Sequence, residues 1–370
     1  MLILSIETSC DDTGVSILKV DKRKREVKIL ANFISSQIKI HRPYGGVVPS
    51  LAKREHQNNL VPLLKKSLKR VKILKEKERG INLDSQASLR KILDRDPDLF
   101  SALIEFFSSY RKPPINYLAV TIGPGLEPCL WVGINFAKAL SYFWHCPIIP
   151  INHLEGHLFS SFLNSRGEAP FVLKKNIFPL LGLIISGGHT ELIAVRQFGE
   201  YKILGQTRDD AAGEAFDKVA RLLGLPYPGG KEIAQIAKNV SQLDNQISLP
   251  RPMINSPDLD FSFSGLKTAV YYLVKDNPEI IQQKRNLIAA EFQQAVVDVL
   301  VEKTVKALKE KEWDYKMVVL GGGVSANLLL RKVFKERISR VIFPQLKYCS
   351  DNGAMIALAA WYHIQKRLDS

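Results

Sequence analysis

A predicted order of strands and loops near the start of the chain recurs in its middle, and this repeat constrains the fold more than any other feature. Each set begins with two short β-rich runs joined by a loop, 8–13 in the first set and 186–190 in the second, and a third strand follows. The predicted strands are residues 2–7, 14–20 and 27–34, and then residues 180–185, 191–196 and 201–204. Two such openings predict two similar lobes.

Strands and helices alternate along the rest of the chain. Further strands are predicted at residues 117–122, 147–151, 316–320 and 340–343. Helices are predicted at residues 50–71, 99–107, 130–144, 215–223, 284–311 and 325–336, and a last helix near residue 351. Strands followed by helices indicate mixed α/β layers.

Length and composition set further limits. A chain of 370 residues with 46% hydrophobic residues can form two cores. The best apolar run, 178–186, is well short of the roughly 20 residues that a membrane span needs. No basic residue precedes the apolar start, which favours a first strand over a signal peptide. The four cysteines lie far apart without a C-x-x-C pair, so a soluble protein of the reducing cytoplasm is expected.

Positive charge predominates in the chain. Lys and Arg number 52 against 37 Asp and Glu, and this net charge of +15 favours a polyanionic partner such as nucleic acid. Residues 65–112 hold 13 Lys or Arg against 7 Asp or Glu. A solvated helix face explains the same local pattern, so charge alone leaves both interpretations open. The residues in question are Lys65, Lys66, Lys69, Arg70, Lys72 and Lys75.

His153 and His157 are the strongest candidate metal ligands. Their i, i+4 spacing places both imidazoles on one face of a helix, where they can bind one ion. Two unrelated surface histidines are the alternative. The pattern is similar to the metalloprotease H-E-x-x-H, but Leu154 occupies the position of the catalytic Glu, and Glu155 would point away from the ion. A hydrolytic zinc site is therefore disfavoured.

Asp351 is the candidate third ligand. Its alternative role is the N-cap of the last helix. Two histidines and one carboxylate with open positions suit Fe2+ or a catalytic Zn2+.

Glycine-rich segments offer candidate phosphate contacts. Residues 321–326 fit G-x-G-x-x-A between a strand and a helix, but no acidic residue follows the next strand until Asp351, which disfavours a nicotinamide site. A P-loop is absent from the sequence. The backbone of loop 186–190 can approach an anion, and Asp217 can accept hydrogen bonds from ribose hydroxyls, although tight turns and helix caps explain both segments equally well.

Ten motifs in the same order resemble the bacterial TsaD family, the tRNA adenosine threonylcarbamoyltransferases of the Kae/Qri/TsaD superfamily, formerly called glycoproteases. The resemblance covers nearly the whole chain except about residues 72–114. The motifs are residues 6–11, 44–49, 123–126, 152–157, 186–190, 210–218, 227–230, 261–268, 321–327 and 351–355.

The resemblance implies an actin/Hsp70-like duplicated α/β fold with the active site in the cleft between the lobes. The first lobe would comprise residues 1–150 and 352–370, with a helical insertion at about 72–114, and the second lobe residues 151–351. The implied reaction moves a threonylcarbamoyl group from threonylcarbamoyl-AMP to N6 of the adenosine beside the anticodon in tRNAs that read codons starting with A. AMP is released. TsaB-like and TsaE-like partner proteins are implied too.

By motif position, the resemblance implies that His153, His157 and Asp351 bind one divalent metal ion, with Fe2+ the first candidate and Zn2+ the second. Asp11 is the candidate base for the proton of the N6 amine, and Asp12 beside it is the second candidate catalytic residue. The residues implied to contact the adenylate are Ile184, Ile185, Ser186, Gly187, Gly188, Asp217, Gly230 and Asn327.

Two departures from the family pattern bear on these expectations. Asp12 stands where most bacterial members carry Glu, so its side chain is one methylene shorter and its reach is in question. The insertion could add tRNA contacts or alter partner assembly. The competing function is a regulatory or binding ATPase of the same fold with Mg2+, which paired histidines disfavour because Mg2+ prefers oxygen ligands.

Overall fold

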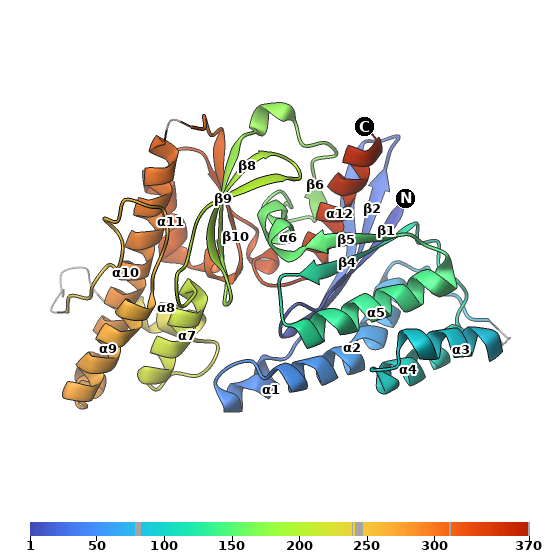
Figure 1. Ribbon diagram of the computed structural model, residues 1–370, viewed down its shortest axis with the longest axis horizontal. Coiled ribbons are helices and arrows are strands. Elements are labelled where there is room, and N and C mark those ends of the chain that lie inside the picture. Colours follow the sequence, from blue (N-terminus) through green and yellow to red (C-terminus); the bar gives the residue numbers. More distant parts are fainter. Residues whose placement is uncertain (78–82, 239, 241–246, 311, 369–370) are drawn as a thin grey trace. The chain divides into compact units, whose positions relative to one another are not determined.

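The computed structural model describes residues 1–77, 83–238, 240, 247–310 and 312–368, and the chain divides into two compact units (Figure 1). Unit 1 comprises Met1–Ile40, Val47–Leu173 and Ser350–Ser370, and unit 2 comprises His41–Gly46 and Lys174–Cys349. Residues 151–173, which the sequence analysis places in the second lobe, lie in unit 1 in this division.

Unit 1 contains a six-stranded sheet in the order β5-β4-β1-β2-β3-β6. Strand β1 pairs antiparallel with β2 and parallel with β4, which itself pairs parallel with β5. The strands are β1 (Leu2–Glu7), β2 (Asp12–Asp21), β3 (Glu26–Ser36), β4 (Tyr117–Gly123), β5 (Ile148–Asn152) and β6 (Glu168–Ala169).

Helices cover both faces of this sheet, with α2 and α5 on one face and α6 and α12 on the other (Figure 1). The helices are α1 (Ile38–His41), which spans the unit boundary, α2 (Pro49–Arg70), α3 (Leu83–Ile92), α4 (Pro97–Ser109), α5 (Glu127–Trp144), α6 (His153–Ser160) and α12 (Gly353–Leu368). A short 3-10 turn, η1 (Arg42–Tyr44), follows α1.

Unit 2 repeats the arrangement with a five-stranded sheet in the order β11-β10-β7-β8-β9. The strands are β7 (Leu180–Ile185), β8 (Thr190–Gln197), β9 (Glu200–Gln206), β10 (Met317–Gly321) and β11 (Val341–Ile342). The helices are α7 (Ala212–Leu222), α8 (Gly229–Ala237), α9 (Ser264–Asp276), α10 (Ile280–Lys309) and α11 (Leu328–Arg337), with 3-10 turns η2 (Lys175–Ile177), η3 (Gly323–Ala326) and η4 (Leu346–Tyr348). The predicted end of α10 at residue 311 lies outside the described residues.

The two sheets have the same topology. In each, an antiparallel three-stranded run is extended on the side of its first strand by two parallel strands, so β1 to β5 correspond to β7 to β11. Among the described residues, the sheet of unit 1 has the edge strand β6 in addition. The predicted duplicated α/β fold of the actin/Hsp70 type is confirmed.

The insertion is part of the core of unit 1 and not a detached hairpin. Helix α4 buries Leu99, Leu103, Phe106 and Phe107 in the same apolar cluster as α2 and α5. The Phe107 and Phe143 rings stack with centroids 4.0 Å apart. Because a buried Phe contributes about 1.5–3 kcal/mol, these contacts anchor the predicted helical insertion. Residues 78–82 of the insertion lie outside the described residues.

Candidate metal centre and active site

Helix α6 begins where strand β5 ends and carries both histidines. The side-chain oxygen of Asn152 accepts hydrogen bonds from the backbone N–H groups of Leu154 and Glu155, at 2.8 and 3.3 Å. This cap starts the helix at His153 and places His157 one turn later. The two rings are buried, with centroids 4.6 Å apart. The histidines therefore share a face, as their spacing predicts.

Asp351 meets the histidines from the segment before α12. Its Oδ1 lies 3.1 Å from Nε2 of His157 and 3.5 Å from Nε2 of His153. The alternative that Asp351 caps α12 is wrong, because Oδ1 of Asn352 accepts the hydrogen bond from the backbone N–H of Met355 at 3.2 Å. Asn352 is the cap, and the Asp351 carboxylate faces the histidines.

A close approach of two glycines sets the position of Asp351. A Cβ atom on Gly14 would lie 2.7 Å from the backbone nitrogen of Gly353, so no larger residue fits there without a shift of the backbone. The Ser5 hydroxyl also donates to the Gly353 carbonyl at 2.6 Å. These contacts hold the start of α12 against β1 and β2. The predicted elements do not include these contacts, although a glycine within a strand is a signal of such a close approach.

The three side chains suit a transition-metal ion. One ligand atom from each of His153, His157 and Asp351 lies within 4.8 Å of the other two. Within the described part of the chain, neither ring nitrogen of His157 makes a hydrogen bond, although Oδ1 of Asp351 lies 3.1 Å from Nε2. The His157 imidazole is buried beside the Asp351 carboxylate without a hydrogen bond between them. A cation bound by both groups would satisfy both. The donor set fits Fe2+ or Zn2+.

The electrostatics of His153 favour a cation at the same place. Burial alone would lower the pKa of His153, but the carboxylates of Asp351 and Glu7 raise it to about 9. A ring that holds its proton this strongly lies in a negative field. A metal ion at Nε2 would replace that proton.

Behind His153 lies Glu7, to which the sequence analysis gave no role. The Glu7 carboxylate is fully buried, accepts hydrogen bonds from Ser9 N–H at 2.6 Å and the Thr121 hydroxyl at 2.5 Å, and lies 3.2 Å from Nδ1 of His153. Burial alone would raise the pKa of Glu7, but the neighbouring His153 and the hydrogen bonds hold it below its ordinary value. The candidate metal ligand His153 therefore has a buried carboxylate beside its Nδ1.

Glu155, between the two histidines, is directed elsewhere. Its Oε2 lies 2.6 Å from Nε2 of His363 on α12. In H-E-x-x-H proteases the Glu beside the ion activates water. Glu155 cannot take that role while it is paired with α12.

The two candidate catalytic carboxylates lie where β1 turns into β2. The His56 ring on α2 holds this loop, with Nε2 2.9 Å from the Cys10 carbonyl oxygen and Nδ1 2.7 Å from the Thr13 hydroxyl. Burial, and then the negative charges of Asp11 and Asp351, raise the pKa of Asp12 to about 7. Oδ1 of Asp12 is buried without a hydrogen-bond partner among the described residues. The negative charge of Asp351, a candidate metal ligand, therefore acts on the Asp12 carboxylate at the end of this loop.

In unit 2, five of the predicted adenylate residues, 184–188, lie at the end of β7 and in the turn that follows it. Ser186 closes the hairpin turn: its N–H donates to the His189 carbonyl at 2.8 Å, and its own carbonyl accepts from Gly213 N–H, at the start of α7, at 3.1 Å. A Cβ atom on Gly322 would lie 2.3 Å from the Ile185 carbonyl oxygen, so the turn after β10 packs on the end of β7. Ile184 and Ile185 are fully buried, so their side chains belong to the core.

The other predicted adenylate residues have local structural roles. Asp217 accepts a hydrogen bond from Gly229 N–H at 2.6 Å, which holds the start of α8 and the adjacent Gly230 against α7. Asn327 caps α11 through Leu330 N–H at 3.1 Å. The helix predicted to start at residue 325 begins three residues later, because the 3-10 turn η3 precedes this cap. By contrast, a Cβ atom on Gly187 or Gly188 would meet nothing within 4 Å, so their backbone is open to a ligand.

Among the described residues, no helix is both long and apolar enough to cross a membrane.

The chain matches the model of a known protein family. The model of the TsaD family, tRNA N6-adenosine threonylcarbamoyltransferase, matches residues 28–82 and 105–358. The unmatched residues between them comprise α3 and most of α4. The chain is also similar to the solved activator of the 2-hydroxyisocaproyl-CoA dehydratase from Clostridium difficile with bound ADPNP, at 14% identity and a TM-score of 0.48 over 100% of this chain and 97% of that one.

Curated relatives match over nearly their whole length. The tRNA N6-adenosine threonylcarbamoyltransferase of Buchnera aphidicola subsp. Schizaphis graminum is 42% identical over 96% of this chain and 91% of its own. The enzyme of the same name from Francisella tularensis subsp. holarctica is 43% identical over 98% of this chain and 94% of its own. The chain therefore belongs to the TsaD family of tRNA N6-adenosine threonylcarbamoyltransferases.

Proposed function

We propose that this chain performs its family's reaction at a divalent metal ion held by His153, His157 and Asp351, with threonylcarbamoyl-AMP as the donor. The acceptor is N6 of the adenosine beside the anticodon in tRNAs that read codons starting with A. The convergence of three ligand atoms within 4.8 Å carries this proposal. The relatives support the transferase and not the regulatory ATPase. Fe2+ is the first candidate ion and Zn2+ the second, since both accept two imidazoles and a carboxylate.

The reaction is an acyl transfer to a weak nucleophile. When bound, the ion would polarise the carbamoyl group or hold the threonyl oxygens. The N6 nitrogen bonds to the carbamoyl carbon, the bond from that carbon to the phosphate oxygen breaks, and AMP leaves with the electron pair. The N6 proton must pass to a base. The protein's task is to place the two reactants and to receive this proton.

Asp11 is the proposed base. Asp12, at the first position of β2, is the second proposed catalytic residue. The carbonyl of Asp11 accepts a hydrogen bond from Gln37 N–H at 3.1 Å, which together with the His56 contacts fixes the backbone of the loop. We expect Asp11→Asn to lower the transfer rate by about 100-fold or more, and Asp12→Glu to be tolerated. Transfer rates of both variants, measured at saturating tRNA and threonylcarbamoyl-AMP, test this expectation. An unchanged rate in Asp11→Asn would make Asp11 a structural residue of the hairpin.

The adenylate is proposed to bind in unit 2. The open backbone of Gly187 and Gly188 can donate N–H groups to the phosphate, and Asp217 and Asn327 can contact the nucleoside. The main chain of Ile184, Ile185 and Ser186, at the end of β7, would also contact the adenylate. Gly230 would contact it from the start of α8, beside Asp217.

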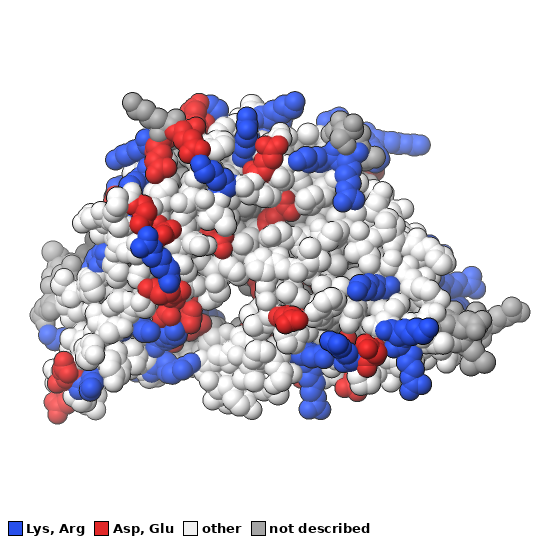
Figure 2. All heavy atoms as spheres, in the orientation of Figure 1, with Lys and Arg blue, Asp and Glu red and all other residues white. Residues whose placement is uncertain are grey.

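Basic side chains on unit 1 are proposed to contact tRNA. Figure 2 shows several Lys and Arg side chains over the helices α2 to α5, with fewer acidic ones between them. We call the following residues the basic cluster: Lys65, Lys66, Lys69, Arg70, Lys72 and Lys75. Phosphates of the substrate are the polyanion that such a surface would attract.

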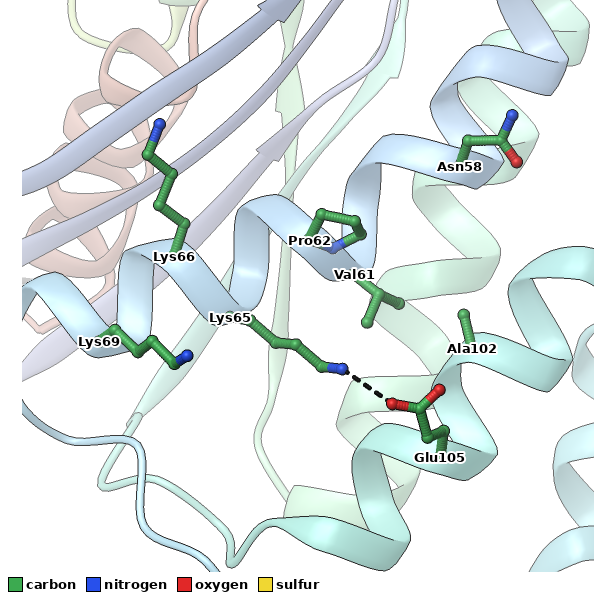
Figure 3. A pocket seen from close by; sticks show the side chains of 8 residues that line it. All are labelled: Asn58, Val61, Pro62, Lys65, Lys66, Lys69, Ala102 and Glu105. Atoms are coloured by element: carbon green, nitrogen blue, oxygen red, sulfur yellow. Dashed lines mark hydrogen bonds and ion pairs between the residues drawn. The ribbon is translucent and has the colours of Figure 1, made fainter.

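Part of the basic cluster lines a pocket of about 500 Å³ between α2 and α4 (Figure 3). There Lys65 pairs with Glu105 at 3.2 Å, and the Lys66 ammonium lies 4.4 Å from the centre of the Phe33 ring. Lys66 and the other four members of the cluster, Lys69, Arg70, Lys72 and Lys75, are exposed, and among the described residues these other four make no aromatic or ion-pair contact. These four are the best candidates for phosphate contacts.

The cytoplasm, where tRNA is modified, is the proposed location. A TsaB-like and a TsaE-like protein are proposed as partners on the strength of the family resemblance.

One assay separates the transferase from the ATPase. Metal-loaded protein is incubated with threonylcarbamoyl-AMP and tRNA, and the tRNA is digested for nucleoside mass spectrometry. We expect threonylcarbamoyladenosine and free AMP, loss of both after chelation, and recovery with Fe2+ or Zn2+. A second incubation contains ATP in place of threonylcarbamoyl-AMP. ATP hydrolysis in it, with no modified nucleoside in the first incubation, would overturn the proposal.

A further inference from the structure

We propose that Glu7 is a positioning residue of the metal site: its carboxylate keeps a proton on Nδ1 of His153 and so leaves Nε2 to bind the ion. This inference rests on the proposed metal site and adds to it a residue that does not touch the ion. All groups involved lie within unit 1.

Three contacts hold the Glu7 carboxylate in one orientation. Oε1 accepts the hydrogen bond from the backbone N–H of Ser9 at 2.6 Å. Oε2 accepts from the hydroxyl of Thr121 at 2.5 Å, and the same oxygen lies 3.2 Å from Nδ1 of His153. Thr121 is on β4, the parallel neighbour of β1, so the sheet itself places this donor. The carboxylate is 0% exposed, and water does not compete for it.

The chemistry of the partners determines where the proton lies. A carboxylate only accepts hydrogen bonds, so its contact with Nδ1 of His153 is attractive only if Nδ1 carries a hydrogen. The Ser9 hydroxyl, 3.1 Å from the same nitrogen, can donate or accept and so fixes neither form. With the proton held on Nδ1, the lone pair of the neutral ring is on Nε2. That is the nitrogen 3.5 Å from Oδ1 of Asp351.

A purely structural role for Glu7 would not require its contact with His153. The contacts with Ser9 and Thr121 already tie the end of β1 to β4, and a neutral side chain could make them. Burying an ionised carboxylate is costly unless it is compensated. The third contact, to a metal ligand, supplies that compensation, and metal-bound histidines commonly donate their other N–H to a carboxylate.

Glu7→Gln tests the proposal because it reverses one hydrogen bond. The amide oxygen must face Ser9 N–H, which places the amide nitrogen against Nδ1 of His153. That nitrogen donates, so the ring is driven to carry its proton on Nε2, where it opposes metal binding. We expect Zn2+ and Co2+ affinities about 10- to 100-fold weaker than in the parent protein. Competition titration with a chromophoric chelator at one fixed pH measures them, with circular dichroism to check the fold.

Ser9→Ala is the matched control, because it removes the other partner of the same nitrogen and leaves Glu7 in place. Its metal affinity should stay within about threefold of the parent's. Glu7→Asp is the second variant and keeps the charge, so it remains informative if Glu7→Gln does not fold. The shorter side chain withdraws the carboxylate from His153, and we expect at least threefold weaker binding.

The outcomes separate this inference from the proposed metal site. His157→Ala should lose the metal. If His157→Ala loses it while Glu7→Gln and Glu7→Asp bind as tightly as the parent, the inference is overturned and the metal site stands. Equal losses in Glu7→Gln and Ser9→Ala would also overturn the inference, since they would indicate a general disturbance. If His157→Ala binds metal as tightly as the parent, the proposed site itself is wrong.

Discussion

Replacing Asp12 by Asn should stabilise the metal-free protein at neutral and alkaline pH. Burial, Asp11 and Asp351 raise the pKa of Asp12 from 3.8 to about 7. Because the folded state holds this proton more tightly than the unfolded chain, the stability from the protonated form is fully present below pH 4 and is lost as pH rises through about 7. Asn has the shape of the protonated carboxyl group but does not ionise, so the variant does not lose stability as the pH rises.

The size of the effect follows from the pKa difference. About 3 pKa units at 1.36 kcal/mol each give an advantage of up to about 4 kcal/mol for Asp12→Asn at pH 8. At pH 5 the same calculation gives about 1.5 kcal/mol. A divalent cation would offset the charge of Asp351 and reduce the advantage.

Urea unfolding measures the stability difference between Asp12→Asn and the parent protein. Chelator-treated proteins are unfolded at both pH values, and tryptophan fluorescence follows the transition. Three of the four tryptophans, Trp131, Trp144 and Trp361, lie in unit 1 and report on its transition. Asp21, at the other end of β2, is the matched control: hydrogen bonds from the backbone N–H groups of Lys24 and Arg23 lower its pKa. Asp21→Asn should therefore change stability with the opposite sign. An Asp12→Asn advantage that is absent at pH 8, or equal at both pH values, would refute the reasoning.

Three further outcomes are expected. Changing Lys69, Arg70, Lys72 and Lys75 to Gln should flatten the salt dependence of tRNA binding by roughly 0.9 per lost phosphate contact, with transfer at saturating tRNA retained. Identical slopes and affinities would exclude this surface as a tRNA contact. Phe106→Ala, which empties a position beside Trp144, should lower the free energy of unfolding by about 3–5 kcal/mol in a urea titration, and a change below about 1 kcal/mol would show that the insertion packs loosely. Asn152→Ala removes the cap of α6 and should cost about 1 kcal/mol and weaken metal binding, and an unchanged metal affinity would show that the cap does not position His153.

Local patterns predicted the elements and the helical histidine pair. The repeated hairpins are confirmed because alternating β-rich runs and short loops are encoded within about 20 residues. The pairing of His153 with His157 needs only a helix of one turn, which Asn152 starts.

Contacts between distant segments were not predictable in the same way. The Ser5–Gly353 hydrogen bond joins residues nearly the whole chain apart, and no local pattern places α12 against β1. The contact between Glu7 and His153 likewise depends on the parallel pairing of β1 with β4 and of β4 with β5. For Asp351, a cap and a ligand fit the sequence equally well. Only the position of Asn352 showed which residue is the cap.

The most direct test of the metal-dependent transferase is nucleoside mass spectrometry of tRNA treated with His157→Ala. The variant receives threonylcarbamoyl-AMP and tRNA beside the parent protein and a control, His145→Asn, whose histidine is exposed at the end of α5. We expect threonylcarbamoyladenosine with the parent and the control, and none with His157→Ala, which should also contain no metal by elemental analysis. Full modification by a folded, metal-free His157→Ala protein would contradict the account.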